Sequence, residues 1–278
     1  MAILTRPAGQ SAGLASALRL RGWKVYDWPA LLLTGLPAVQ VPDPAQFDLV
    51  MFVSGNAARF YFEQLACASG LAQPVVWPAE VPAATVGLGS AQAVRECAGD
   101  TVRLVHPPPD AANFDSEALW AEMQRLDLRP RRVLIVRGGR GLQGHGRSWL
   151  AEQFQAAGTE VTLYAAYRRE PVVWPPQRRR QLRAWRAGSL CPVWFLSSRE
   201  AVDALVQQMG AKAILTYWTG CRVIVPHPRI AQEISQLADS CGIATRPVGG
   251  APTEPDPQAI MIQTCMPHDD AVLEAIVN

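Results

Sequence analysis

The stretch from Arg131 to Arg169 carries the clearest pattern of apolar and polar positions in the chain. It begins with the short β-branched run Val133–Val136, which is typical of a buried strand. A loop rich in glycine and arginine follows, and apolar residues then recur at helical spacing up to Gly158. Glu160–Tyr164 indicates a second strand. The stretch therefore predicts a strand–loop–helix–strand unit with its ligand-binding residues at the carboxyl end of the first strand.

The same alternation of short apolar runs and helical segments continues through the rest of the chain. Strands that alternate with helices are typical of α/β domains with parallel sheets. A last helix is expected to begin within 258–265, and the tail after Met266 is expected to fray. The further strands are expected over residues 2–5, 23–33, 49–53, 83–86, 101–105, 193–196, 222–225 and 243–248.

Parts of this pattern recur about 140 residues later, which is a domain-scale period. A strand–serine–helix unit occurs twice, as do a second strand-to-helix unit and a Pro-rich loop leading into a helix. A strand–arginine–helix unit also occurs twice, around Arg6 and around Arg137, but out of phase with the others. The paired segments are 52–54 with 195–197, 86–91 with 226–231, and 116–119 with 257–260.

Two Pro-rich segments, 36–46 and 171–176, are typical of linkers. Two domain organisations fit the repeat. In one, each half of the chain is a continuous domain. In the other, residues 36–168 form a domain inserted into a second one, which is built from residues 1–35 and 169–278. The linkers favour the insertion, in which the two domains are permuted copies of each other. The chain then passes between the domains twice, and this predicts a hinge and a cleft.

Composition narrows the function classes. The length of 278 residues suggests about two domains, and 49% apolar residues allow sizeable cores. The net charge of +2 is too small to indicate a nucleic-acid partner, and the basic run Gln177–Ala187 is interpreted as a solvated helix face. The N-terminus is typical of a buried strand rather than a signal peptide, and no apolar run is long enough to span a membrane. A cytoplasmic protein is therefore expected.

Neither the cysteines nor the histidines indicate a cofactor. The six cysteines form no CxxC pair, and none of the four histidines has the spacing of metal ligands. The run Gly138–Gly141 could cradle a phosphate, but the chain lacks both GxGxxG and the Lys-Ser/Thr of a P-loop. No metal and no cofactor are therefore expected.

A set of short segments follows along nearly the whole chain: ILTRPAGQ, FVSGNAA, TVGLGSAQAV, FDSEALW, VLIVRGGRG with GRSWL and YAAYRR, FLSSREAV, and VIVPHPRIAQEI. In their order and spacing, rather than through one motif, these segments resemble the uroporphyrinogen-III synthase family. The resemblance implies two flavodoxin-like α/β domains joined by a two-segment connector. The chain departs from the family in a longer loop at 141–146, a Pro- and Arg-rich segment at 171–192, and Ile230 in place of a hydroxyl residue.

The resemblance also implies an activity. The substrate is expected to be hydroxymethylbilane, a linear tetrapyrrole with eight carboxylates, which loses water and closes to uroporphyrinogen III with ring D inverted. The pyrrole nitrogen supplies the electronic push, so the protein mainly positions a flexible chain and needs no cofactor. A monomer is expected, with transient contact to hydroxymethylbilane synthase and with neither nucleic acid nor a membrane as partner.

Such a substrate needs hydrogen-bond donors for its carboxylates. The first candidates lie at or just after the expected strand ends, where the alternative role is a local salt bridge or surface charge: Arg6, Arg137, Gly138, Arg140, Arg147 and Arg229. The second set lies at strand-to-helix turns, where the alternative role is N-capping: Ser54, Asn56, Ser90, Ser197 and Ser198.

Tyr167 is the candidate general acid, because it matches the family's tyrosine in YAAYRR and a phenol is protonated at neutral pH. In the alternative, its ring packs in the wall of the site and its hydroxyl lies in water. Tyr164 is expected to face the opposite side of the strand. Two other classes stay open: a two-domain module that binds a small anion, and a flavodoxin-like or nucleotide-using enzyme.

Overall fold

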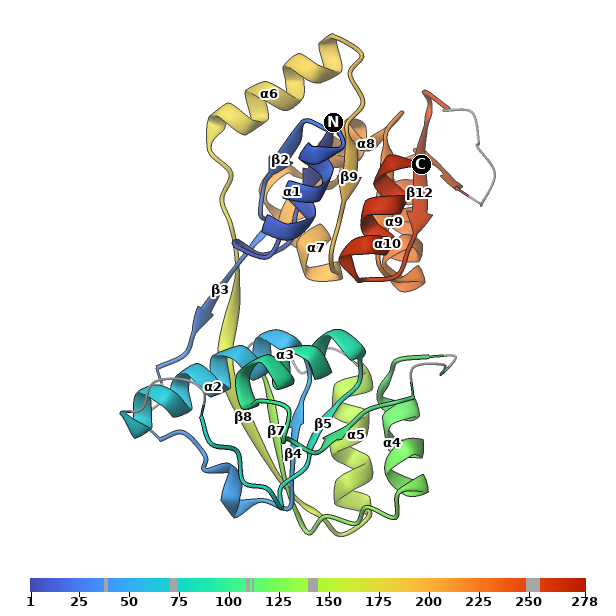
Figure 1. Ribbon diagram of the computed structural model, residues 1–278. Coiled ribbons are helices and arrows are strands. Elements are labelled where there is room, and N and C mark those ends of the chain that lie inside the picture. Colours follow the sequence, from blue (N-terminus) through green and yellow to red (C-terminus); the bar gives the residue numbers. More distant parts are fainter. Residues whose placement is uncertain (38–39, 71–74, 109–110, 112, 140–144, 249–255) are drawn as a thin grey trace. The chain divides into compact units, whose positions relative to one another are not determined.

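The computed structural model describes the chain except for residues 38–39, 71–74, 109–110, 112, 140–144 and 249–255, and at 145–148 it describes the backbone alone. The chain divides into two compact units, one made of Met1–Leu33 with Glu170–Asn278 and the other of Thr34–Arg169. Each unit has its own six-stranded sheet with helices packed on it (Figure 1). The chain passes from one unit to the other within β3 (Leu31–Gly35) and within β8 (Glu160–Pro171).

The sheet of the first unit has the order β11-β12-β10-β9-β1-β2, and its neighbouring strands are parallel. Side chains alternate between the two faces of a strand, so each strand contributes to two cores. Ile3 packs in a tryptophan-rich core, whereas Ala2 and Leu4 pack in the core on the other face. The strands are β1 (Ala2–Leu4), β2 (Val25–Asp27), β9 (Val193–Phe195), β10 (Arg222–Val225), β11 (Ala244–Pro247) and β12 (Ala259–Thr264).

Helices α1 (Ala12–Leu20) and α10 (Asp269–Val277) contribute the apolar side chains of the Ala2 and Leu4 core. Four helices contribute to the tryptophan-rich core: α6 (Pro176–Ala187), α7 (Arg199–Met209), α8 (Ala211–Trp218) and α9 (Pro228–Ser240). In α6 the buried residues are Leu182 and Trp185. The helix of the basic run therefore packs against its unit through these two apolar residues.

The sheet of the second unit has the order β3-β8-β7-β4-β5-β6. The chain moves outward through β4 (Leu49–Phe52), β5 (Ala83–Thr85) and β6 (Leu104–Val105), then returns to β7 (Arg132–Gly139) and β8. Right-handed crossovers therefore place the helices of the outward path on one face and those of the return path on the other. The first pair is α2 (Gly55–Ser69) and α3 (Leu88–Ala98), and the second is α4 (Ser116–Arg125) and α5 (His145–Ala156).

The expected fold class, two flavodoxin-like parallel-sheet units with permuted strand order, is confirmed. The insertion of one independent domain into another, with boundaries at residues 36 and 168, remains our proposal. In each unit the strand that carries the arginine turn, β1 or β7, lies beside the strand that carries the serine turn, β9 or β4. This adjacency places the corresponding turns at the same kind of position in both sheets.

The C-terminal prediction is wrong. Residues 259–264 form β12, which is buried between β10 and β11, and the tail forms α10 with four buried apolar residues. The short run Ala259–Ile262 fits a buried strand as well as a helix, and periodicity alone does not separate the two. The supposed repeat of 116–119 at 257–260 is therefore also wrong. The single strand expected over 23–33 is two strands, β2 and β3, that belong to different sheets and are separated by Pro29.

Candidate functional site

The second unit has a topological switch point between β4 and β7. The chain leaves β4 towards β5 on one side, and β7 continues to β8 on the other. Helices on opposite faces diverge at such a point, and the crevice outside the carboxyl ends of the two strands is where open α/β sheets bind ligands. Ser54 follows β4, and Arg137 and Gly138 lie in the last three residues of β7.

Ser54 begins α2 as its N-cap. Its backbone is extended, and its Oγ accepts a hydrogen bond from the backbone N–H of Ala57 at 3.2 Å. The same Oγ lies 3.3 Å from the hydroxyl of Tyr167. Asn56 is the second residue of the helix and lies outside the capping position. Ser54 thus joins the helix N-terminus, where backbone N–H groups favour anions, to the candidate acid.

Tyr167 is completely buried. Its ring stacks on Phe60 of α2 with the centroids 5.2 Å apart, and its hydroxyl accepts an N–H from Arg169 at 2.7 Å. The Arg169 guanidinium also lies 5.4 Å from the centroid of the ring. The packed ring of the alternative role is confirmed, but its hydroxyl does not lie in water, because it is enclosed between the Arg169 guanidinium and the Ser54 hydroxyl.

Tyr164 and Tyr167 lie on the same face of β8, so the expectation of opposite faces is also wrong. Tyr164 pairs with Val136 and Tyr167 with Gly138, because a β-bulge between Arg137 and Gly138 lets three steps of β8 oppose two of β7. Both rings contact α2, Tyr164 at Tyr61 and Tyr167 at Phe60. The bulge is what turns the Tyr167 ring towards Ser54.

Gln64 of α2 holds the bulge in place. Its Nε2 donates to the carbonyls of Leu36 and Ala166, at 2.6 and 2.9 Å, and its Oε1 accepts the Tyr164 hydroxyl at 2.9 Å. Burial raises the pKa of the Tyr164 phenol, so this hydroxyl remains a donor over a wide pH range. Tyr164 therefore positions Tyr167 through Gln64 and the backbone.

Gly138 leaves the space that the Tyr167 ring occupies. A Cβ at this position would lie 2.9 Å from the Cζ of Tyr167 and 3.2 Å from its hydroxyl oxygen. Contacts this short would force the ring or the strand to move. The position that was expected to bind substrate thus has a second, steric role.

Arg137 is half-buried at the end of β7. Its Nε is buried and has no hydrogen-bond partner among the residues that the structure describes. A buried guanidinium nitrogen without a partner costs free energy unless an anion or water binds it. Arg140 lies outside the described residues, and so does the side chain of Arg147 in the first turn of α5. Ser90 lies within the first turn of α3, whose N-cap is Gly87.

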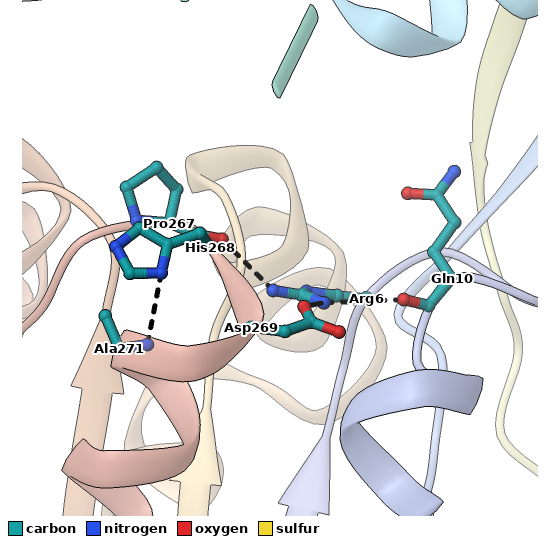
Figure 2. A network of polar contacts seen from close by, with 6 residues as sticks. All are labelled: Arg6, Gln10, Pro267, His268, Asp269 and Ala271. Atoms are coloured by element: carbon teal, nitrogen blue, oxygen red, sulfur yellow. Dashed lines mark hydrogen bonds and ion pairs between the residues drawn. The ribbon is translucent and has the colours of Figure 1, made fainter. Parts of the chain in front are cut away.

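In the first unit, Arg6 follows β1 and is bound within the unit (Figure 2). Its guanidinium forms an ion pair with Asp269 and donates to the carbonyls of Pro267 and Gln10 at 3.2 and 3.5 Å. It also lies 5.1 Å from the centroid of the Phe195 ring. Arg6 thus forms a local salt bridge, which is its alternative role.

The network around Arg6 depends on the start of α10. His268 is the N-cap of this helix, and its Nδ1 accepts the backbone N–H of Ala271 at 3.2 Å (Figure 2). The cap places Asp269 at the first position of the helix, where a carboxylate is favoured by the helix dipole. Asp269 is therefore a fixed partner that holds Arg6 between the first strand and the last helix.

Of the remaining candidates in the first unit, Ser198 caps α7 and accepts the backbone N–H of Ala201 at 3.2 Å. The Oγ of Ser197 is buried and has no partner within the described part of the chain. Arg229 is exposed in the first turn of α9. The capping role is thus confirmed for Ser54 and Ser198, and it is wrong for Asn56, Ser90 and Ser197.

The family model described as uroporphyrinogen-III synthase HemD matches residues 12–249. The chain belongs to the uroporphyrinogen-III synthase family. Members of this family are cyclising lyases of tetrapyrrole biosynthesis. A search of curated protein sequences finds no match.

Solved structures of uroporphyrinogen III synthases have a similar fold, and two of them show this by their TM-scores. A mutant uroporphyrinogen III synthase from Thermus thermophilus has a TM-score of 0.51 at 16% identity, over 95% of this chain and 92% of that one. The uroporphyrinogen-III synthetase from Helicobacter pylori has a TM-score of 0.52 at 11% identity, over 99% of this chain and 97% of that one. At these identities the likeness concerns the fold alone.

Sequence reasoning missed three residues that shape the candidate site: Arg169, Phe60 and Gln64. Arg169 could have been found, because residues two apart on a strand share a face and YRR places it two after Tyr167. Phe60 and Gln64 are one turn apart on α2, a spacing that also fits ordinary core packing.

Within the described residues, no group of three or more His, Cys, Asp or Glu side chains is arranged to hold a metal. Among the helices that the structure describes, none is long and apolar enough to cross a membrane.

Proposed function

We propose that the protein converts hydroxymethylbilane to uroporphyrinogen III, with loss of water and inversion of ring D. The observation that carries this proposal is the family match over residues 12–249. The reaction serves the biosynthesis of tetrapyrroles such as heme. The proposal includes a cytoplasmic monomer that needs no cofactor and contacts hydroxymethylbilane synthase transiently.

In this reaction the protein contributes mainly by positioning the flexible substrate and less by activating its leaving group. The pyrrole nitrogen expels the hydroxyl group and leaves an azafulvene, which ring D attacks through its substituted carbon to form a spiro intermediate. This intermediate fragments and recloses, and a proton is lost as the macrocycle forms. The linear chain closes without inversion when it is not held, so the main catalytic term is the orientation of ring D.

The carboxylates of the substrate need fixed donors. Arg137 is the best-supported anchor, because its buried Nε has no partner among the described residues and its strand end lies next to the end of β4, which leads into α2. The first-turn N–H groups of α2 and α3, with Asn56 and Ser90, add donors along the same sheet edge. Arg140, Arg147, Ser197, Ser198 and Arg229 stay in the proposed set, and Arg6 can join it only if Asp269 releases it.

We assign the acid role to Tyr167 acting through Ser54. Tyr167 accepts from Arg169, so its own proton is available to the Ser54 oxygen at 3.3 Å. The half-buried Ser54 hydroxyl then donates to the departing hydroxyl, which leaves as water. The proton released on ring closure returns to Tyr167. The enclosed phenol thus acts through one intervening hydroxyl.

The test generates hydroxymethylbilane from porphobilinogen with hydroxymethylbilane synthase, adds the purified protein, oxidises the products and separates isomers I and III. Isomer III is expected in the presence of the protein, and its yield should survive chelation and dialysis. Isomer I alone, at any protein concentration, would contradict the proposal. Loss of isomer III on dialysis with recovery on metal addition would contradict its cofactor-free part.

A further inference from the structure

Two cysteines lie together at the amino-terminal edge of the first unit's sheet, at the opposite end of the strands from the turns described above. Cys191 is exposed and precedes β9, and Cys221 is buried and directly precedes β10. The Sγ of Cys191 lies 3.5 Å from the place where a Cβ on Gly220 would be. The Cys191 sulfur is therefore adjacent to the peptide that leads into Cys221.

The strand register brings the α-carbons of the two cysteines within reach of a disulfide, and their side chains are close enough to hydrogen-bond with each other. Val223 pairs with Trp194 in neighbouring parallel strands, so continuing the register places Cys221 opposite Pro192 and one step from Cys191. Neighbouring strands lie about 4.8 Å apart and residues advance about 3.3 Å, which puts the two α-carbons roughly 6 Å apart. Disulfides span α-carbon distances of about 4.4–6.8 Å. The backbone is thus compatible with a cross-link.

Both cysteines line one cavity of about 490 Å³, a volume within the range of small-molecule sites. Arg186 of α6 also lines it and is held there by a hydrogen bond from its Nη1 to the carbonyl of Thr219 at 2.8 Å. A neighbouring hollow of about 420 Å³ shares Arg186 and adds Arg183. The Arg186 guanidinium in the same cavity as the exposed thiol, with Arg183 in the adjoining hollow, favours a reagent that carries carboxylates.

We propose that Cys191 and Cys221 form a reversible disulfide by exchange with a small, carboxylate-bearing disulfide that enters this cavity. The Cys191 thiolate attacks one sulfur of the reagent, whose S–S bond breaks and releases one small thiol. The Cys221 thiol then loses its proton and attacks the Cys191 sulfur, releasing the second small thiol. Two protein thiols are oxidised, and one small disulfide is reduced to two thiols.

The order of attack follows from the surroundings of the two sulfurs. Burial, and after it the neighbouring Cys191 thiol, raises the pKa of Cys221, and the Cys221 Sγ donates to the carbonyl of Tyr217 at 3.3 Å. A thiol that stays protonated is a poor first nucleophile. Cys191 therefore reacts first, Cys221 resolves the mixed disulfide, and the resolving step becomes faster as the pH rises.

The test incubates the reduced, full-length protein with glutathione disulfide, alkylates the remaining thiols and maps the linkages by mass spectrometry. A peptide linked through Cys191 and Cys221 is expected, while Cys67, an exposed thiol of the second unit, carries glutathione only. In Cys191→Ser, an exposed change, Cys221 should stay alkylatable. In Cys221→Ser, glutathione should remain on Cys191. A wild-type protein that keeps glutathione on Cys191 and a free Cys221 at every oxidant ratio would overturn the proposal.

The role of the cavity has its own control. Arg186→Gln should slow oxidation by glutathione disulfide roughly 2- to 5-fold, the size of an exposed charge interaction. Arg180→Gln removes the same charge from an exposed position of α6 that does not line the cavity, and it should have no effect. Cystamine, a cationic disulfide, should not be slowed by either change. Equal rates for both variants with glutathione disulfide would overturn the assignment of the cavity as the entry site.

Discussion

Tyr164 and Tyr167 point to the same face of β8, although two residues three positions apart in a regular strand lie on opposite faces. The bulge opposite Arg137 and Gly138 adds one residue to β8, which turns both rings to the same face. Gln64 of α2 holds the bulge in place through its hydrogen bonds to the backbone. The enclosed Tyr167 hydroxyl, its Arg169 donor and the Ser54 cap are all consequences of this one irregularity. A local departure from regular pairing thus builds the most constrained part of the proposed site.

Tyr167→Phe should lower turnover roughly 10²-fold, the low end for loss of general acid catalysis. The ring and its stacking on Phe60 remain, so the fold should be preserved. The measurement is kcat for isomer III formation, with circular dichroism as the check on folding. Full turnover and full isomer III selectivity would make Tyr167 a packing residue only.

The matched control for this variant is Tyr26→Phe, which removes a phenol from the aromatic cluster of the first unit. Tyr164→Phe is unsuitable as a silent control, because it leaves the Gln64 Oε1 without its donor and loosens the bulge. We expect Tyr164→Phe to lower the free energy of unfolding by about 1 kcal/mol and to reduce turnover less than Tyr167→Phe does.

Arg137→Ala should raise KM for hydroxymethylbilane roughly 10-fold with a smaller change in kcat, because a carboxylate anchor contributes similar binding to substrate and transition state. Arg129→Ala is the control, since Arg129 is exposed, pairs with Asp127 and precedes the amino end of β7. The same analysis applies to Arg140→Ala and to the double variant. Unchanged kinetics in all three would remove this strand end from the site.

Gly138→Ala should lower the free energy of unfolding by about 1–3 kcal/mol, because the new Cβ overlaps the Tyr167 ring. Gly89→Ala is the control, as a Cβ there meets nothing within 4 Å. Urea unfolding of both variants gives the comparison. If Gly138→Ala is as stable as the control and equally active, the Tyr167 ring is not confined by the strand as described.

The lowered pKa of Asp48 should make the stability of the protein depend on pH. Its carboxylate accepts the backbone N–H of Arg132 and of Arg131, both at 2.9 Å, and these bonds, that of Arg132 first, lower its pKa. A lowered folded-state pKa stabilises the protein above the unfolded-state pKa, and this stabilisation is lost as the pH falls through the folded value. When the pH is lowered from about 7 to about 3, the free energy of unfolding should therefore fall less in Asp48→Asn than in the wild type. Parallel curves for the two proteins would contradict this role.

The sequence was sufficient for the fold class and for the turns that carry the candidate residues, because strand–helix alternation and glycine or serine at the turns are local signals. It failed where the tertiary context decides. The run Ala259–Ile262 becomes a strand because a place beside β10 buries it on both faces, and Arg6 binds Asp269 from the far end of the chain. The bulged segment of β8 contains no glycine or proline that would indicate a bulge, so the sequence could not predict that the two tyrosines share a face.

The isomer composition of the product, followed as the protein is titrated into a fixed flux of hydroxymethylbilane, shows whether the protein catalyses closure with inversion of ring D. Closure without the protein gives isomer I, so isomer III should rise with protein concentration until it is essentially the sole product. Arg129→Ala should give the same curve as the wild type. A product that stays isomer I throughout the titration, from a protein shown to be folded, would mean that the protein does not direct ring closure.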